Sequence, residues 1–214
     1  MLTTLRIIVA CLAFSLAATG PVAASQGVVS LAVPGAEGTF KVRHEKVIQL
    51  VKKGASNEVL QQEVDKLLNY RALAETSLGG AAQYEGKCAP RCAEFETVLA
   101  RLIRENYLKW IRSDKKYEVL YLGEEVKGRA MHVRTQIAIT RDGKPEVVEV
   151  VYAMEQTPMG WKVSDIITDG VSLARNYKFE FNKVLKDKGI DELISRLESK
   201  VDNVAARPPA SAKK

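Results

Sequence analysis

The sequence has 214 residues, with 32 Lys and Arg against 26 Asp and Glu, and its formal net charge is +6. This length suits one domain, and it is sufficient to bury a full core with some volume left for a cavity. The basic residues are interspersed with acidic ones, and no basic stripe with interleaved aromatic residues occurs. We therefore expect no nucleic acid as a partner.

Residues 1–24 have the pattern of a secretory signal peptide. Arg6 precedes an apolar run over residues 7–18, and small residues at 22–24 favour cleavage after Ala24. The run is shorter than the about 20 residues that span a bilayer, so we expect secretion without a retained anchor. We predict a flexible leader over 25–38, a single domain over 39–204 and a disordered tail over 205–214.

Helical periodicity dominates the first half of the mature chain. Segments 39–53, 56–68 and 71–78 repeat apolar residues at helical spacing, with Gly54 and Gly79 as stop signals. In the first segment the predicted apolar face contains Val42, Val47, Ile48 and Val51. The strongest amphipathic segment is 92–111, with a stripe of Phe95, Val98, Leu99, Leu102, Ile103, Asn106 and Trp110 and with Tyr107 beside it.

Two cysteines remain after the expected cleavage, Cys88 and Cys92. In an oxidising compartment a single nearby pair predicts a structural disulfide, and Pro90 favours a tight loop between the two residues. A redox pair would favour the spacing Cys-x-x-Cys. A zinc site would need His44 and His132, which lie far along the chain on either side, so we predict no metal site.

Strand signals follow in the second half. Segments 117–122, 130–140, 145–156 and 161–168 are rich in Val, Ile, Tyr and Thr, and turn signals lie at 141–144 and 158–160. The central segments alternate apolar and polar residues, which predicts one apolar face with Met131, Val133, Ile137, Ile139, Val148, Val150, Tyr152 and Met154. We predict an α+β fold with a curved antiparallel four-stranded sheet packed against a helical layer, closed by helices over 171–187 and 190–203.

No set of residues assembles a reaction. Ser172 lies at a strand-to-helix turn, but the second glycine of a nucleophile elbow is missing and both histidines precede the serine. We interpret Ser172 as a helix-capping residue. Asp165 has no paired carboxylate, and we interpret it as a partner of Arg175 or of the turn at 169–170. His132 is expected on the exposed face of the sheet.

A specific motif covers residues 160–181, where a short apolar strand turns through a Gly directly into an amphipathic helix. Its positions are Trp161, Val163, Asp165, Gly170, Val171, Ser172, Leu173, Asn176, Tyr177 and Phe181, followed by Gly-Ile-Asp-Glu-Leu-Ile at 189–194. Together these residues resemble the signature of the MlaC (toluene-tolerance) family. The chain departs from the family at 80–82, where it has Gly-Ala-Ala in place of a basic residue and an aromatic pair.

The resemblance implies a periplasmic phospholipid carrier whose fold is close to the nuclear-transport-factor-like and cystatin-like folds. It implies phospholipid as ligand, no cofactor, and two partners: an inner-membrane ABC-type lipid transporter with a ring-shaped periplasmic subunit, and an outer-membrane lipoprotein–porin complex. Two alternatives stay open, a secreted enzyme of the same α+β fold and a carrier of another apolar lipid such as a hopanoid.

Acyl chains would then lie between the sheet and the helices. The candidate lipid-binding residues are Leu99, Ile103, Tyr107, Val133, Ile137, Ile139, Val148, Val150, Tyr152, Met154, Val163, Tyr177 and Phe181. Aromatic side chains such as Tyr152 or Tyr177 could contact both the tails and the headgroup, because a tyrosine has an apolar ring and a polar tip.

Overall fold

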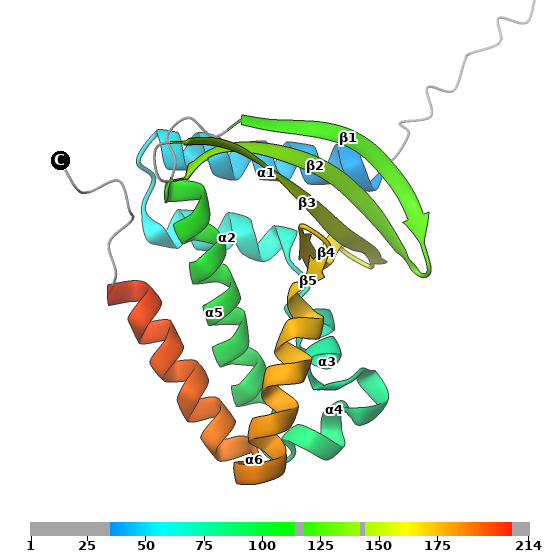
Figure 1. Cartoon of the computed structure of the whole chain (residues 1–214), viewed down its shortest axis with the longest axis vertical. Coiled ribbons are helices and arrows are strands. Elements are labelled where there is room, and N and C mark those ends of the chain that lie inside the picture. Colours follow the sequence, from blue (N-terminus) through cyan, green and yellow to red (C-terminus); the bar gives the residue numbers. More distant parts are fainter. Residues whose placement is uncertain (1–34, 114–117, 142–143, 207–214) are drawn as a thin grey trace, which may run out of the picture. The chain divides into compact units, whose positions relative to one another are not determined.

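Helices precede the strands along the chain and one long helix follows them in the computed structural model, which describes residues 35–113, 118–141 and 144–206 (Figure 1). The helices are α1 (Ala36–Lys52), α2 (Asn57–Leu67), α3 (Tyr70–Leu78), α4 (Ala81–Cys88), α5 (Cys92–Ser113) and α6 (Leu173–Ala206), and the strands are β1 (Glu118–Lys127), β2 (Ala130–Arg141), β3 (Lys144–Thr157), β4 (Gly160–Thr168) and β5 (Val171–Ser172). The expected signal peptide, most of the expected leader, residues 142 and 143 of the expected hairpin and the tail from 207 lie outside the described residues.

The strands form one antiparallel sheet in the order β1-β2-β3-β4-β5, and the α+β class is as predicted. The sheet has five strands instead of the four expected. The extra strand, β5, uses residues that we predicted as the start of the helix over 171–187. Positive φ angles at Asp169 (47°) and Gly170 (80°) reverse the chain at once, so Val171 and Ser172 pair with β4 before the helix begins.

Two bulges interrupt the regular pairing. The first lies in β1 between Tyr121 and Glu124. The second lies between β3 and β4, where Ala153 pairs with Asp165 but Met154 pairs with Val163, so β4 contains one extra residue. Bulges bend a strand and increase its twist, and the sheet curves over the helical layer (Figure 1).

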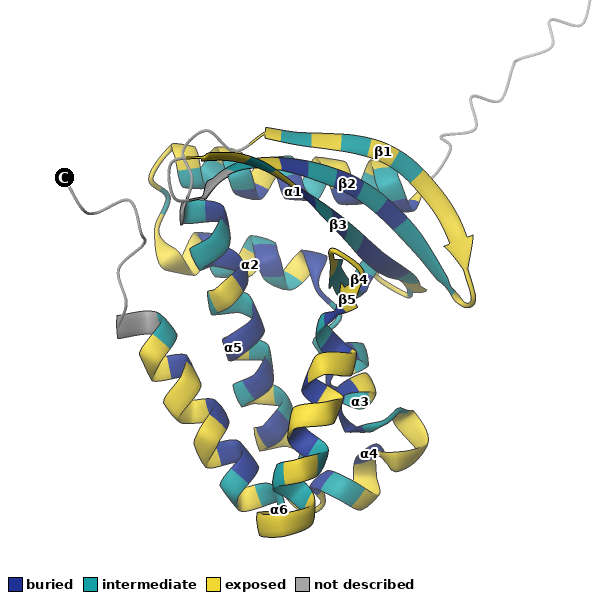
Figure 2. Ribbon diagram, in the orientation of Figure 1, coloured by how far each residue is buried: buried dark blue, intermediate teal, exposed yellow. Residues whose placement is uncertain are grey.

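The two edges of the sheet differ. Beyond β4 the edge is covered by β5 and by the α2–α3 junction, where Leu68 forms a bridge with Val163 and the Asn69 amide donates to the Val163 carbonyl at 2.8 Å. Among the described residues β1 pairs with β2 alone. Its outer edge has no strand partner in the described ranges, and Glu118, Glu124, Glu125 and Lys127 along it are exposed (Figure 2).

The core lies between the sheet and the helices, and Figure 2 shows buried residues on the faces that meet. One prediction for α1 was wrong: the buried residues are Ala36, Phe40, His44 and Val47, whereas Val42 is 68% exposed. The error arose because valines were counted as the apolar stripe and the histidine was not. Phe40, His44 and Val47 have the helical spacing that faces the core.

Helix α4 was not predicted. Its eight residues bury only Tyr84 and Cys88, which is too little apolar signal for a periodicity argument. Gly79, in the left-handed conformation, ends α3 as expected. The expected break between the last two helices lies at Gly189, whose φ of 78° and ψ of −175° interrupt α6. No helix in the described ranges is both long enough and apolar enough to cross a bilayer.

Candidate functional site

An apolar cavity of about 260 Å³ lies between the sheet and helices α5 and α6. Its lining residues come from α5 (Ile103, Asn106, Tyr107, Trp110), β2 (Ile139), β3 (Val148, Val150, Tyr152), β4 (Ile166, Thr168) and α6 (Leu173, Tyr177). None of these side chains is charged. The cavity therefore suits an apolar ligand and offers no partner to a buried ion.

Exposure separates the mouth of the cavity from its interior. Asn106 and Thr168 are exposed, and Trp110, Ile139, Ile166 and Leu173 are half-buried. Tyr107, Tyr152 and Tyr177 are buried, as are the aliphatic residues Ile103, Val148 and Val150. The polar side chains thus lie where solvent enters, and the interior is made of rings and aliphatic groups.

The sequence-predicted lipid-binding residues fall into two groups. Seven of them line the cavity: Ile103, Tyr107, Ile139, Val148, Val150, Tyr152 and Tyr177. The others are buried but do not line it: Leu99, Val133, Ile137, Met154, Val163 and Phe181. Helix α1 packs against β2 and α3 packs against β4, so parts of the same apolar faces are filled by helices.

Sequence reasoning selected Val163 of β4 and missed Ile166 and Thr168, which are the residues that β4 contributes to the cavity wall. Strict alternation from Val163 would turn Asp165 toward the helices. The extra residue in the β4 bulge shifts the phase, so Ile166 pairs with Tyr152 and Thr168 pairs with Val150, and both line the cavity. Asn106 and Trp110 were on the predicted stripe of α5 but were not selected as site residues. Leu173 was seen only as part of the motif.

The start of α6 is fixed by Asp165 and Ser172. The Asp165 carboxylate accepts hydrogen bonds from the Ser172 hydroxyl and from the Ala174 amide, the latter at 3.1 Å. The Ser172 hydroxyl oxygen accepts from the Arg175 amide at 3.1 Å, so its predicted capping role is confirmed. Asp165 therefore bonds to the first turn of the helix, not to the Arg175 side chain or the turn at 169–170 as expected. These bonds position Leu173 at the mouth of the cavity.

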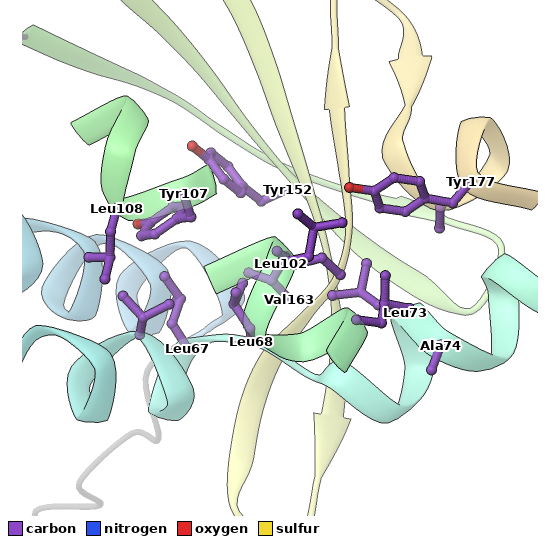
Figure 3. Close-up of a cluster of buried hydrophobic side chains, with 14 of the residues drawn as sticks. Leu67, Leu68, Leu73, Ala74, Leu102, Tyr107, Leu108, Tyr152, Val163 and Tyr177 are labelled. Carbon is purple, nitrogen blue, oxygen red and sulfur yellow. The ribbon is translucent and has the colours of Figure 1, made fainter. Parts of the chain in front are cut away.

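One side of the cavity wall belongs to an aromatic block, which we define as Phe40, His44, Tyr107, Tyr121 and Tyr152. Tyr107 and Tyr152 line the cavity, and Figure 3 shows them next to each other. The His44 ring lies behind both, with ring centroids 6.2 Å from Tyr107 and 5.9 Å from Tyr152. Phe40 lies 4.1 Å from the Tyr152 ring.

His44 is a buried neutral residue of this block. Its Nδ1 lies 3.2 Å from the Tyr121 hydroxyl, and the side chain is fully buried. Burial lowers the pKa of His44 to about 3, because the charged imidazolium would lose its hydration. Within the described residues no three His, Cys, Asp or Glu side chains come together as a possible metal site.

A second hollow of about 400 Å³ lies between the two halves of α6. Although it is larger, charged side chains form much of its wall: Glu180, Lys183, Asp187, Lys188, Arg196 and Lys200. Several of them are paired, including Lys200 with Glu180 at 3.1 Å. It lacks the uncharged lining of the cavity beneath the sheet, which we therefore take as the candidate site.

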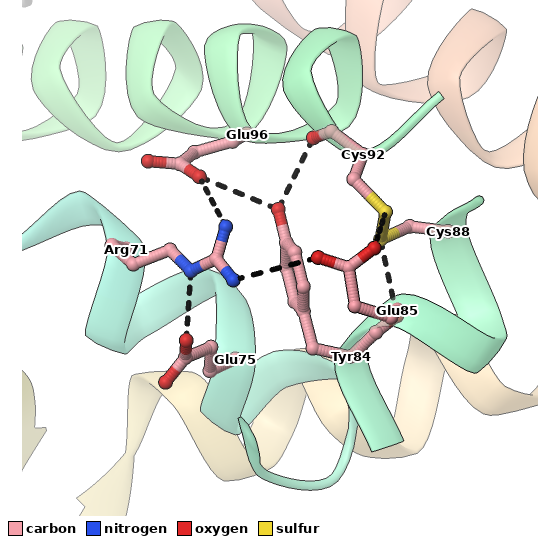
Figure 4. Close-up of a disulfide and its surroundings, with 7 residues drawn as sticks. All are labelled: Arg71, Glu75, Tyr84, Glu85, Cys88, Cys92 and Glu96. Carbon is pink, nitrogen blue, oxygen red and sulfur yellow. Dashed lines mark hydrogen bonds and ion pairs between the residues drawn. A yellow bond between two sulfur atoms is a disulfide. The ribbon is translucent and has the colours of Figure 1, made fainter. Parts of the chain in front are cut away.

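The predicted disulfide between Cys88 and Cys92 is present (Figure 4). The Tyr84 hydroxyl donates to the Cys92 carbonyl at 3.1 Å, and the Arg71 guanidinium lies 4.0 Å from the Tyr84 ring centre. Arg71 also pairs with Glu75 at 2.7 Å and with Glu96 at 3.4 Å. None of these residues lines the cavity.

Comparison with known proteins identifies relatives of this chain. A sequence model for the family described as MlaC protein matches residues 40–199. A phospholipid-binding protein from Ralstonia solanacearum, solved in complex with a phospholipid, has the same fold with a TM-score of 0.66 and 22% sequence identity, over 80% of this chain and 99% of that chain. A search of curated protein sequences gives no match.

Proposed function

Because the chain belongs to the MlaC family, we propose that it is a periplasmic phospholipid carrier and that acyl chains occupy the cavity beneath the sheet. The observation that carries the proposal is an uncharged cavity whose interior is apolar and whose polar residues, Asn106 and Thr168, lie at the mouth. The phospholipid bound to the Ralstonia protein of the same fold supports the choice of ligand.

Enclosure is the physical requirement for such a carrier. Each methylene exposed to water costs about 0.8 kcal/mol, so the roughly thirty methylenes of two acyl chains would cost on the order of 20 kcal/mol. A cavity of about 260 Å³ is at the lower limit of ordinary ligand pockets, which hold about 300–1,000 Å³. Two acyl chains therefore require the cavity to enlarge.

The partners follow from the family and are part of the proposal. They are an inner-membrane ABC-type lipid transporter with a ring-shaped periplasmic subunit and an outer-membrane lipoprotein–porin complex. Exchange with membrane-bound partners does not require that the carrier bind lipid more tightly than a bilayer does, because the lipid starts in an apolar solvent. A binding role is favoured over catalysis because Asp165 and Ser172 are both engaged in capping α6.

The proposal is tested by mass spectrometry of lipid extracted from undenatured protein of the periplasmic fraction, whose mature N-terminus should be Ser25. The wild type should contain phospholipid. Val150→Asp should lose it, because an isolated carboxylate cannot be buried among acyl chains without a large penalty. Val151→Asp is the matched control, because adjacent strand residues point to opposite faces and Val151 does not line the cavity.

Circular dichroism must show that both variants are folded. Equal loss of lipid in the two variants would contradict the assigned face of β3. Full lipid occupancy in folded Val150→Asp would mean that the lipid lies elsewhere.

A further inference from the structure

We propose that the aromatic block limits how deep an acyl chain enters the cavity and thereby sets which acyl lengths the protein prefers. This inference rests on the proposed function and adds a substrate preference to it. The residues that set the limit are Tyr107 on α5 and Tyr152 on β3, which line the cavity and have the buried His44 ring behind them.

The block closes this side of the cavity because the two lining rings are backed by further buried rings. Tyr107 is 6% exposed and Tyr152 is 1% exposed, whereas the residues at the mouth are exposed or half-buried. Directly behind the two rings lie Phe40 and His44, each 0% exposed. An acyl chain that enters from the mouth meets rings supported by further rings.

The support behind the limit comes from several parts of the fold. Phe40 and His44 belong to α1 and Tyr121 belongs to β1. The rings of His44 and Tyr121 are also in edge contact at a centroid distance of 6.4 Å. Moving one ring inward disturbs contacts with α1, β1 and β3 together. Close-packed interiors resist such displacement, so the block should yield less readily than the half-buried side chains at the mouth, Trp110, Ile139, Ile166 and Leu173.

The limit is also chemically suited to the end of an acyl chain. Burial keeps His44 uncharged, and it raises the pKa of Tyr152, so the phenol keeps its proton. The terminal methyl group of a lipid therefore meets uncharged rings. Replacing one of the two tyrosines with leucine would leave apolar space at the place where the acyl chain ends.

The test uses phosphatidylethanolamines that differ only in acyl length, palmitoyl against stearoyl, mixed in equal amounts and loaded onto Tyr107→Leu, Tyr152→Leu and the wild type. The bound ratio is read by mass spectrometry. If a shortened ring admits two more methylenes, the stearoyl-to-palmitoyl ratio should rise on the order of tenfold over the wild type. The two variants lie on different elements, so one remains informative if the other fails to fold.

Tyr84→Leu is the matched control. Tyr84 is also a buried tyrosine, but it lies at the disulfide end and does not line the cavity. Its ratio should equal that of the wild type. An unchanged ratio in both folded block variants, or an equal rise in Tyr84→Leu, overturns the proposal. If the wild type binds neither lipid, the proposed function itself fails, whereas binding without a shift removes the depth limit alone.

Discussion

The cavity and the disulfide-bearing end of the molecule are built from different interactions. Around the cavity the side chains are uncharged and space remains between the walls. At the other end a disulfide links α4 to α5, and the Arg91 guanidinium pairs with Glu94 and with Asp191 of α6. Apolar contacts are non-directional, so cavity walls can separate and repack, whereas ion pairs and a covalent bond specify one arrangement.

The contrast does not mean that the ion pairs supply most of the stability. Arg71 is 48% exposed in its pairs with Glu75 and Glu96, and exposed ion pairs contribute about 0–1 kcal/mol each. The disulfide end also buries Tyr84 and Phe95 completely. Packing stabilises both regions, and the ion pairs and the disulfide define the geometry of the disulfide end.

The largest effect on the free energy of unfolding is expected from substitutions at two neighbouring residues of α5. Leu102 and Ile103 are each 2% exposed, but only Ile103 lines the cavity. Leu102→Ala should lower the free energy of unfolding by about 2–5 kcal/mol. Ile103→Ala should cost less, because a side chain beside empty space has fewer contacts to lose. Urea unfolding of the two variants measures the difference.

A second prediction concerns the loss of stability at acidic pH. The titrating group is His44 beside the cavity, whereas at the disulfide end it is Glu94. The pKa of His44 is about 3 in the folded protein and 6.5 ordinarily. Below pH 6.5 the His44 side chain binds a proton in the unfolded chain but not in the folded one. The contribution of His44 to the free energy of unfolding is therefore fully present above pH 6.5 and is lost progressively between pH 6.5 and about 3. We expect a loss of about 2 kcal/mol at pH 5.

Urea unfolding at pH 7 and pH 5 measures this loss, and His44→Gln should remove it. At the disulfide end Arg91 lowers the pKa of Glu94 below its ordinary 4.5, so that contribution persists above pH 4.5 and is lost only at lower pH. If His44→Gln shows the same loss between pH 7 and pH 5 as the wild type, the acid sensitivity does not lie in the aromatic block.

The smallest effect is expected from the disulfide. Replacing Cys88 and Cys92 with serine should lower the free energy of unfolding by about 2 kcal/mol at most, because the closed loop is very short. Lipid occupancy, measured by mass spectrometry, should be unchanged, because neither residue lines the cavity. A drop in occupancy would show that the regions are coupled. The route would be the ring contacts from Phe95 to Phe181 (5.9 Å) and from Phe181 to Tyr177 (5.1 Å).

The sequence predicted the cavity wall best where the strands are regular. Alternation along β3 identified Val148, Val150 and Tyr152, which all line the cavity. It failed on β4, because a bulge changes the phase without leaving a mark such as Gly or Pro in the strand. The aromatic block was not predicted either. Its members come from four elements, and the proximity of His44 to Tyr107 depends on tertiary packing that no local period contains.

The outer edge of β1, which has no strand partner in the part of the chain that the structure describes, bears on self-association of the protein. A strand edge with free amide and carbonyl groups is a template for pairing with another chain. On this edge Glu118, Glu124, Glu125 and Lys127 are exposed, and charged side chains on an edge strand disfavour such pairing. The edge beyond β4 is already occupied by β5 and the α2–α3 junction. Pairing into a continuous intermolecular sheet is therefore disfavoured at both edges of the curved sheet, by charged side chains at β1 and by covering segments beyond β4.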